Sequence, residues 1–195
     1  MKIQIIVGST RQGRQTDRLA KWVLNQAETV EGVSVELLDL RDFELPFFNE
    51  PISPRYNPER KPEPAVDTWL KKIAEADGYI IVTPEYDHSI PGVLKNALDF
   101  IAFETVKKPM AIVSHGTVGG ARAAEHLKGI ISEIQAVPVP VNVAFAHRIG
   151  ETVSEEGVLE ESLVKAPYGP HTALQHMLSD LVWYTKALTD ARAKS

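Results

Sequence analysis

A hydroxyl-rich and cationic turn near the start of the chain carries the first candidate chemistry. Residues 8–16 read GSTRQGRQT, after an apolar run and before a segment whose apolar residues have helical spacing. Free backbone N–H groups and the positive end of a helix dipole favour anions at such a turn. Ser9, Thr10, Arg11 and Thr16 add side-chain donors, so we expect the turn to surround a phosphate monoester.

This turn matches neither of two common phosphate loops. Residues 8–13 have the G-x-x-x-x-G spacing of a P-loop, but Arg14 and Gln15 stand where Lys and Ser or Thr are required. The dinucleotide fingerprint G-x-G-x-x-G fails because Thr10 takes the place of its second glycine. A purely structural role, with Thr16 as a helix cap, is the alternative.

Two later segments have the composition of a binding surface for a flat ring. Residues 84–99 read PEYDHSIPGVLKNALD. Pro91 suits the first position of a helix and Ser89 its cap, but neither role explains the polar and aromatic residues 85–88. Residues 114–121, SHGTVGGA, form a glycine-rich turn whose backbone a planar heterocycle could approach closely. The two segments predict a cleft with two walls.

The elements that position these turns follow from the alternation of apolar runs with helical segments, which is typical of β–α units around a parallel sheet. The predicted strands are Ile3–Val7, Val33–Leu38, Gly78–Thr83, Met110–Ser114 and Val139–Val143. Helical spacing is found over Leu19–Val30, Val93–Ile101, Ala124–Ile134 and about Thr172–Ala193.

The fifth predicted strand belongs at an edge of the sheet, because Pro138 and Pro140 cannot donate to a neighbouring strand. This placement fits an α/β, three-layer, doubly wound fold with a five-stranded parallel sheet in the order 2-1-3-4-5. In that order, ligands bind at the carboxyl ends where strands 1 and 3 diverge. The three turns described above would then share one crevice.

Two irregular segments connect these elements. Glu44–Pro64 contains six prolines and follows the second strand, so we expect a lid, an interface arm, or both. Gly150–Pro170 is acidic and rich in turns, which indicates a solvated surface connection.

Composition excludes several functional classes. The 195 residues predict one domain, and a net charge of −5 argues against partners such as nucleic acid or an anionic membrane. Without cysteine, redox chemistry needs a bound cofactor. The six histidines show no H-E-x-x-H pattern, and no G-x-S-x-G elbow is present, so we expect neither a metal site nor a serine hydrolase. We expect a cytoplasmic protein, because no signal-peptide or membrane-spanning run is found.

Three motifs, GSTRxGR, PEYxHSIPGxLKNxLD and SxGxxGGARAAExL, resemble those of the NADPH-dependent FMN reductases. This family has a flavodoxin-like fold and includes quinone, azo and chromate reductases. The resemblance implies bound FMN, NADPH or NADH as co-substrate, and a small-molecule electron acceptor such as a quinone, azo compound or flavin. It also implies a homodimer or homotetramer. One nucleotide crevice would serve both substrates in turn, which predicts a ping-pong route. No catalytic side chain is expected, since FMN carries the chemistry.

The resemblance also assigns residues. It implies that the FMN phosphate is held by Ser9, Arg11, Gln15 and Thr16. The isoalloxazine would be held by Pro84, Glu85, Tyr86, Asp87, His88 and Ser89, and approached by His115 and Gly116. Arg14 either joins the phosphate set or points outward.

This chain departs from the family pattern at several positions. Many relatives have Ser and Asn where Arg14 and Thr16 stand, and Tyr is frequent at the place of His115. Asp87 replaces the commoner Asn, and its carboxylate would oppose negative charge on reduced flavin and lower the reduction potential.

Two alternatives differ from an enzyme. An FMN-binding electron-transfer module of the flavodoxin type would lack its own NAD(P)H activity. The mild acidity of the chain and the two arginines of the first turn favour the enzyme. A fold relative that has lost flavin is the second alternative.

Overall fold

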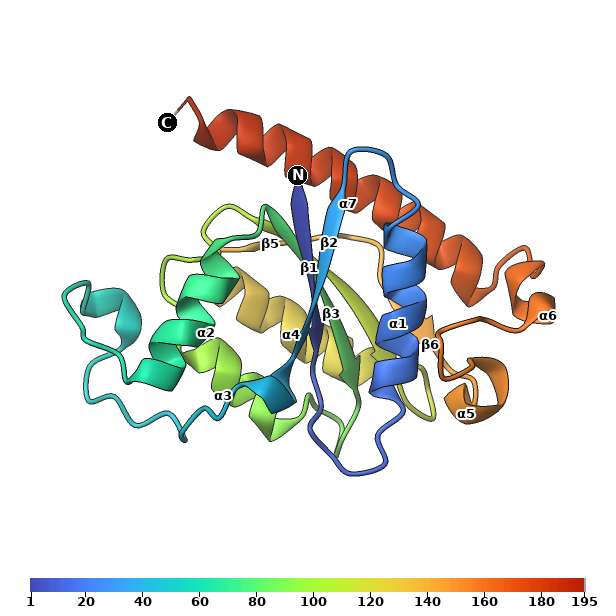
Figure 1. Cartoon of the computed structure of the whole chain (residues 1–195), viewed down its shortest axis with the longest axis horizontal. Helices are drawn as coiled ribbons and strands as arrows, with labels where there is room; N and C mark the ends of the chain where they lie inside the picture. Colours follow the sequence, from blue (N-terminus) through green and yellow to red (C-terminus); the bar gives the residue numbers. More distant parts are fainter. Residues whose placement is uncertain (195) are drawn as a thin grey trace.

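In a computed structural model that describes residues 1–194, a parallel sheet lies between two layers of helices (Figure 1). The long strands are β1 (Lys2–Val7), β2 (Ser34–Asp39), β3 (Gly78–Pro84) and β4 (Pro109–His115). The order β2-β1-β3-β4-β5 confirms the predicted order, with Ile5 of β1 between Leu37 of β2 and Ile80 of β3. The carboxyl ends of these strands therefore lie together at one end of the sheet, the lower end in Figure 1.

The helices cover both faces of the sheet, as the three-layer prediction requires. On one face, α1 (Thr16–Ala27) and α7 (Pro170–Arg192) pack on alternate strand residues such as Ile5 and Val82. On the other face, α2 (Pro64–Ala74), α3 (Gly92–Asp99) and α4 (Ala121–Glu133) bury Ile6 and Ile81. This alternation explains why the strands are apolar throughout, because each side is covered.

Helix α2 is missing from the sequence-based prediction. Its buried residues Val66, Trp69, Leu70 and Ile73 have helical spacing, and Pro64 occupies the first helical position, where a proline needs no N–H partner. The helical spacing of these apolar residues was therefore visible in the sequence. The prolines before it instead favoured an irregular segment up to Pro64, and no helix was predicted after it. The 3₁₀ turn η1 (Leu40–Asp42) precedes that segment, and η2 (Pro54–Tyr56) forms a second 3₁₀ turn within it.

The predicted fifth strand, Val139–Val143, is wrong in its bounds. Two short strands replace it, β5 (Val137–Pro138) and β6 (Val143–Phe145), and both pair with β4 at the edge of the sheet. Between the pairs Met110–Pro138 and Val113–Val143, four residues of the edge chain lie opposite two of β4. Pro140 within this excursion cannot donate a ladder hydrogen bond, which explains the interruption and confirms the edge position.

The segment 150–170 is more than a solvated connection. It contains α5 (Ile149–Thr152) at its start and α6 (Glu161–Val164), and it buries Val153 and Leu159. Carbonyl groups of this segment accept hydrogen bonds from Lys21 and Asn25 of α1. These contacts pin the segment to α1 and place the residues that precede it beside the first turn.

Candidate functional site

A cavity of about 290 Å³ lies at the carboxyl ends of β1, β3 and β4, where the sequence predicted a crevice. Its walls come from the first, third and fourth β–α turns and from the chain after β6. The lining residues are Arg11, Gly13, Arg14, Gln15, Pro84, Glu85, Tyr86, His115, Gly116, His147 and Ile149. The structure thus brings most of the predicted site residues together around one space.

The first turn offers an anion site beside this cavity. The N-cap residue of α1 is Gln15, whose side chain does not cap the helix; within residues 1–194 no side chain accepts from the backbone N–H groups of Thr16 and Asp17, whereas that of Arg18 donates to Asp17 Oδ1 at 3.0 Å. Arg11 is exposed, and its guanidinium carbon lies 5.8 Å from the centre of the Tyr86 ring. Among the described residues, Arg11 makes no ion pair, so its charge is available to a ligand.

Arg14 does not point outward, which was one of the two sequence-based expectations. Its side chain is only 3% exposed and forms a bidentate ion pair with Asp39, at the end of β2. It also donates to the Ser9 carbonyl, while its buried Nε has no hydrogen-bond partner. The Asp39 carboxyl is partly buried, which alone would raise its pKa, but the hydrogen bonds from Arg14 and Arg41 lower that pKa below its usual range.

Two hydroxyl groups of the first turn lie beneath the cavity and tie it to the other turns. The Ser9 hydroxyl is 2.9 Å from the Tyr86 hydroxyl, and Thr16 Oγ1 is 2.9 Å from Nε2 of His115. Thr16 is the first residue of α1 and does not cap it, so the structural alternative for Thr16 is wrong. Both hydroxyls therefore hold neighbouring aromatic rings in place.

Burial lowers the pKa of His115 to about 4. At neutral pH the imidazole is therefore uncharged. It lines the cavity as a neutral group that can donate at one nitrogen and accept at the other.

The third turn is a two-residue hairpin at Asp87 and His88. Tyr86 and Ser89 exchange both backbone hydrogen bonds at 2.9 Å, and the two residues between them have positive φ angles of 48° and 64°. These angles are those of a type I′ turn, in which both central residues adopt the left-handed region. Because Asp87 and His88 lie exposed at the tip, they do not line the cavity.

Ser89 does not cap the helix that follows, contrary to the sequence-based interpretation. The N-cap of α3 is Pro91, which the sequence placed at the first helical position instead, and α3 begins at Gly92. The hydroxyl of Ser89 lies 3.0 Å from Nδ1 of His126 on α4. This contact holds the hairpin against α4.

Glu85 is committed to α4 through its side chain. Its carboxylate accepts from the backbone N–H of Arg122 at 3.0 Å and from the Arg122 guanidinium at 2.7 Å. Burial alone would raise the pKa of this carboxyl, but these hydrogen bonds lower it below the usual range. The backbone N–H of Glu85 donates to the His115 carbonyl at 2.9 Å, so the backbone carbonyl of Glu85 is the group left for a ligand.

The fourth turn depends on glycines for its close packing. Gly120 is the N-cap residue of α4 with a φ of 73°, and a Cβ there would lie 2.8 Å from the backbone nitrogen of His115. A Cβ on Gly116 would lie 3.3 Å from Cβ of Glu85. The fourth turn therefore approaches the third through bare backbone, as the sequence predicted for a wall that meets a flat ring.

Sequence reasoning missed two lining residues, His147 and Ile149. Both follow β6, and the ring of His147 packs edge-on against Phe145 with centroids 5.5 Å apart. Their position just after the carboxyl end of the last strand was the available signal, since ligands gather at that edge. The misplaced fifth strand obscured it.

In residues 1–194, no helix has the length and apolarity needed to cross a bilayer. Within the same range, no group of three or more His, Cys, Asp or Glu residues could hold a metal ion.

Comparison with known proteins places this site in a family. The family model described as NADPH-dependent FMN reductase matches residues 1–150. An NAD(P)H-dependent FMN reductase of a Nectria species is 35% identical over 173 residues, 85% of this chain and 86% of the relative. A 2-hydroxy-1,4-benzoquinone reductase of a Burkholderia species is 35% identical, over 70% of this chain and 73% of the relative.

A solved structure supports the fold. FerB from Paracoccus denitrificans, a flavoenzyme described as an NAD(P)H:(acceptor) oxidoreductase, superimposes with a TM-score of 0.73 at 23% identity, covering 95% of this chain and 97% of that chain. Because the family model spans most of the sequence and carries all three turns of the cavity, the chain belongs to the NADPH-dependent FMN reductase family.

Proposed function

We propose that this protein is an FMN-dependent NAD(P)H oxidoreductase that reduces a quinone, an azo compound, a flavin or a similar acceptor. The observation that carries the proposal is the single cavity in which the phosphate-type first turn meets the two ring-type turns. Relatives named as FMN reductases, a benzoquinone reductase and azoreductases support this acceptor class.

The residues at the cavity fit the phosphate end of FMN. Arg11 is a free cation at the rim, and the uncapped start of α1 supplies N–H groups directed at an anion. Gln15 lines the same part of the cavity. Ser9 and Thr16 would serve from beneath, since a hydroxyl can donate to phosphate while it accepts from a neighbour.

The other end of the cavity fits a flat ring. Pro84 presents its pyrrolidine, Tyr86 its aromatic ring and Gly116 bare backbone. His115 adds a polar group without charge. We infer that Glu85 contributes its backbone only. Asp87, His88 and Ser89 would shape the hairpin and reach the ring only at its exposed edge.

The chemistry that bound FMN would supply is hydride acceptance from NAD(P)H and electron donation to the acceptor. The chain's own residues orient the ring, anchor the phosphate and leave one open face for both substrates. Because the cavity is shared, the first product must leave before the acceptor enters. This order is the ping-pong route.

The test uses the purified chain. We expect the absorption bands of oxidised flavin, and we expect them to bleach when NADPH or NADH is added without oxygen. Double-reciprocal plots at several acceptor concentrations should give parallel lines, whereas intersecting lines would contradict the shared cavity. Flavin that ignores both nicotinamides would favour the electron-transfer module instead.

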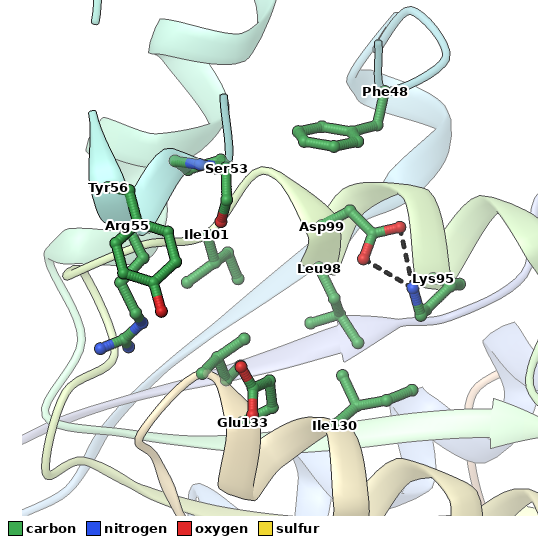
Figure 2. A pocket seen from close by; sticks show the side chains of 12 residues that line it. Phe48, Ser53, Arg55, Tyr56, Lys95, Leu98, Asp99, Ile101, Ile130 and Glu133 are labelled. Carbon is green, nitrogen blue, oxygen red and sulfur yellow. Dashed lines mark hydrogen bonds and ion pairs between the residues drawn. The ribbon is translucent and has the colours of Figure 1, made fainter. Parts of the chain in front are cut away.

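We further propose that the chain assembles into a homodimer or homotetramer through the face formed by residues 44–63, α3 and α4. A groove of about 240 Å³ lies there. Figure 2 shows side chains of the irregular segment, such as Phe48 and Tyr56, around it together with Leu98 of α3 and Ile130 of α4. Phe47 and Tyr56, two aromatic residues of the same irregular segment, are 89% and 81% exposed, and exposed apolar surface of this kind is typical of protein interfaces. This arrangement supports the interface arm over a lid, because the arm lies on the side of α3 and α4 rather than over the site cavity.

Light scattering of the purified chain tests the assembly. We expect a dimer or tetramer for the wild type and a shift toward monomer for Tyr56→Asp, with Tyr168→Asp, at a tyrosine that is also exposed but lies outside residues 44–63, α3 and α4, as the control. A monomeric wild type would contradict the proposal.

A further inference from the structure

A network of one carboxylate and two guanidinium groups lies behind the first turn. Asp39 Oδ1 accepts from Arg14 Nη1 at 2.8 Å and from the backbone N–H of Arg41 at 2.9 Å, and Oδ2 accepts from Arg14 Nη2. Arg14 is buried, Asp39 is 20% exposed through its side chain, and Arg41 is exposed. Asp39 thus connects both arginines at the end of β2.

The two arginines donate hydrogen bonds to three successive carbonyl groups of the first turn, those of Ser9, Thr10 and Arg11. Arg14 Nη1 donates to the Ser9 carbonyl. Arg41 donates to the carbonyl of Thr10 through Nε at 3.4 Å and to that of Arg11 through Nη2 at 2.6 Å. The turn is therefore held from behind by its acceptor atoms.

Peptide geometry converts this hold into an orientation of donors. In a trans peptide, the carbonyl and the N–H of the following residue point in opposite directions. Fixing the carbonyls of Ser9, Thr10 and Arg11 toward the guanidinium groups directs the next N–H groups to the opposite side of the turn, where that of Arg11 has a long hydrogen bond of 3.4 Å to Ser9 Oγ. An anion is attracted to a turn whose N–H groups converge on one side and whose oxygens face away.

The network also indicates that Arg14 supports the turn and does not bind the ligand. Asp39 neutralises it, and its Nη1 and Nη2 already have partners, so its fork is not free to chelate a phosphate. Arg11 is the unpaired cation of the turn in the described part of the chain. Position 14 therefore acts on the backbone, and position 11 faces the ligand.

We propose that Asp39 and Arg41, acting with Arg14, are positioning residues that preset the first turn for a phosphate monoester by holding its carbonyl groups away from the ligand. This proposal rests on the proposed function, since it takes FMN as the source of the phosphate.

The sign of one substitution separates this role from simple electrostatics. Asp39→Asn removes a negative charge behind the anion site, so charge alone predicts tighter binding of FMN. Loss of positioning predicts weaker binding, because a neutral amide cannot hold both nitrogen atoms of the Arg14 fork and the turn loses its support. The two effects have opposite directions.

The experiment titrates the full chain, freed of flavin by dialysis, with FMN and with riboflavin, which has the same ring but no phosphate. For Asp39→Asn we expect FMN affinity to fall by about tenfold, the effect of one charge-assisted hydrogen bond, while riboflavin affinity is unchanged. Arg41→Gln, at an exposed position that folding tolerates, should give a smaller loss with the same selectivity.

Glu36→Gln is the control. Glu36 lies on β2 as Asp39 does and pairs with Lys2 at 2.8 Å and Lys72 at 2.6 Å, with its side chain 30% exposed, but it lies outside the site cavity. We expect this variant to bind both flavins as the wild type does.

Several outcomes would overturn the proposal. FMN binding that is equal or tighter in Asp39→Asn would show that charge alone acts there. An equal loss of riboflavin and FMN affinity would indicate general loosening of the fold. Either result, together with a wild type that binds FMN and is reduced by NADPH, would remove this inference and leave the proposed function standing. A wild type that binds neither flavin would overturn both.

Discussion

The two halves of the site cavity are built on different principles. The first turn uses charged side chains, with Arg14 buried against Asp39 and Arg11 free at the rim. The third and fourth turns use backbone shape, with a hairpin whose tip has positive φ angles and a glycine at the start of α4. The difference teaches that an anion is met by prearranged donors, whereas a flat ring is met by the removal of side chains.

Three side-chain contacts join the two halves. Ser9 and Arg11 meet Tyr86, and Thr16 meets His115. If the halves work independently, a change in one should affect only its own part of the ligand. The following predictions test that division, from the largest expected effect to the smallest.

Gly120→Ala should damage the ring half through packing. The added Cβ would lie 2.8 Å from backbone and side-chain atoms of residues 114 and 115, at a φ of 73°. We expect a loss of about 3 kcal/mol in the free energy of unfolding, measured by chemical denaturation. Gly129→Ala, in the open middle of α4, is the control and should raise stability by about 1 kcal/mol. Equal effects of the two substitutions would contradict the packing account.

Acid should weaken the fold through His115, at the junction of the halves. Its pKa is about 4 in the folded chain against 6.5 for a free histidine, so between these values the unfolded chain binds more protons. Stability that is present above pH 6.5 is therefore lost as the pH falls toward 4, by about 2 kcal/mol at pH 4.5.

Thermal unfolding at several pH values measures this effect. His115→Gln, which has no titratable group, should lose less stability than the wild type between pH 7 and pH 4.5. Identical pH dependence in the two proteins would exclude His115 as the source.

Arg11→Ala should weaken the phosphate half only. We expect FMN affinity to fall by about 30-fold, the equivalent of about 2 kcal/mol for a hydrogen bond to a charged group, with riboflavin affinity unchanged. Arg18→Ala removes the same charge from α1, where Arg18 pairs with Glu155 away from the cavity, and should have little effect. A comparable loss for both ligands would show that Arg11 supports the ring, through Tyr86, rather than the phosphate.

The hairpin tip offers the smallest effect on stability. His88 has a φ of 64°, a region that glycine enters without strain and that type I′ turns prefer for it. We expect His88→Gly to raise the free energy of unfolding by about 0.5–1 kcal/mol in denaturant titrations. A loss of stability would mean that the His88 side chain makes contacts beyond the hairpin.

Asp87→Asn tests the electrostatic expectation for the same tip. Asparagine also tolerates a positive φ, so the hairpin should keep its shape while it loses one negative charge. We expect a redox titration to give a higher flavin reduction potential for the variant. An unchanged or lower potential would remove Asp87 from the account of the flavin environment.

The sequence predicted the strand order and the crevice because those follow from local signals. Apolar runs bounded by turns predict buried strands, and prolines predict the sheet edge, as Pro138 and Pro140 do. The same local logic failed where distant residues decide. Nothing near Arg14 in the sequence indicates that it pairs with Asp39, 25 residues later, or that Glu85 accepts from the start of α4.

Helix α2 and the segment 150–170 show a second kind of failure. The helical spacing of Val66, Trp69 and Ile73 was available, but it follows a proline-rich stretch that favoured an irregular structure. The acidic residues of the later segment suggested solvent contact, yet Arg18 and Lys21 of α1 anchor it through Glu155. In both cases composition outweighed periodicity or pairing in the interpretation.

A crystal structure of the chain with FMN tests the central claim most directly. We predict that the phosphate lies beside Arg11 at the start of α1 and that the isoalloxazine lies against Tyr86, His115 and Gly116. A flavin bound in the groove near Phe48 and Ile130, or a phosphate remote from Arg11, would contradict the account.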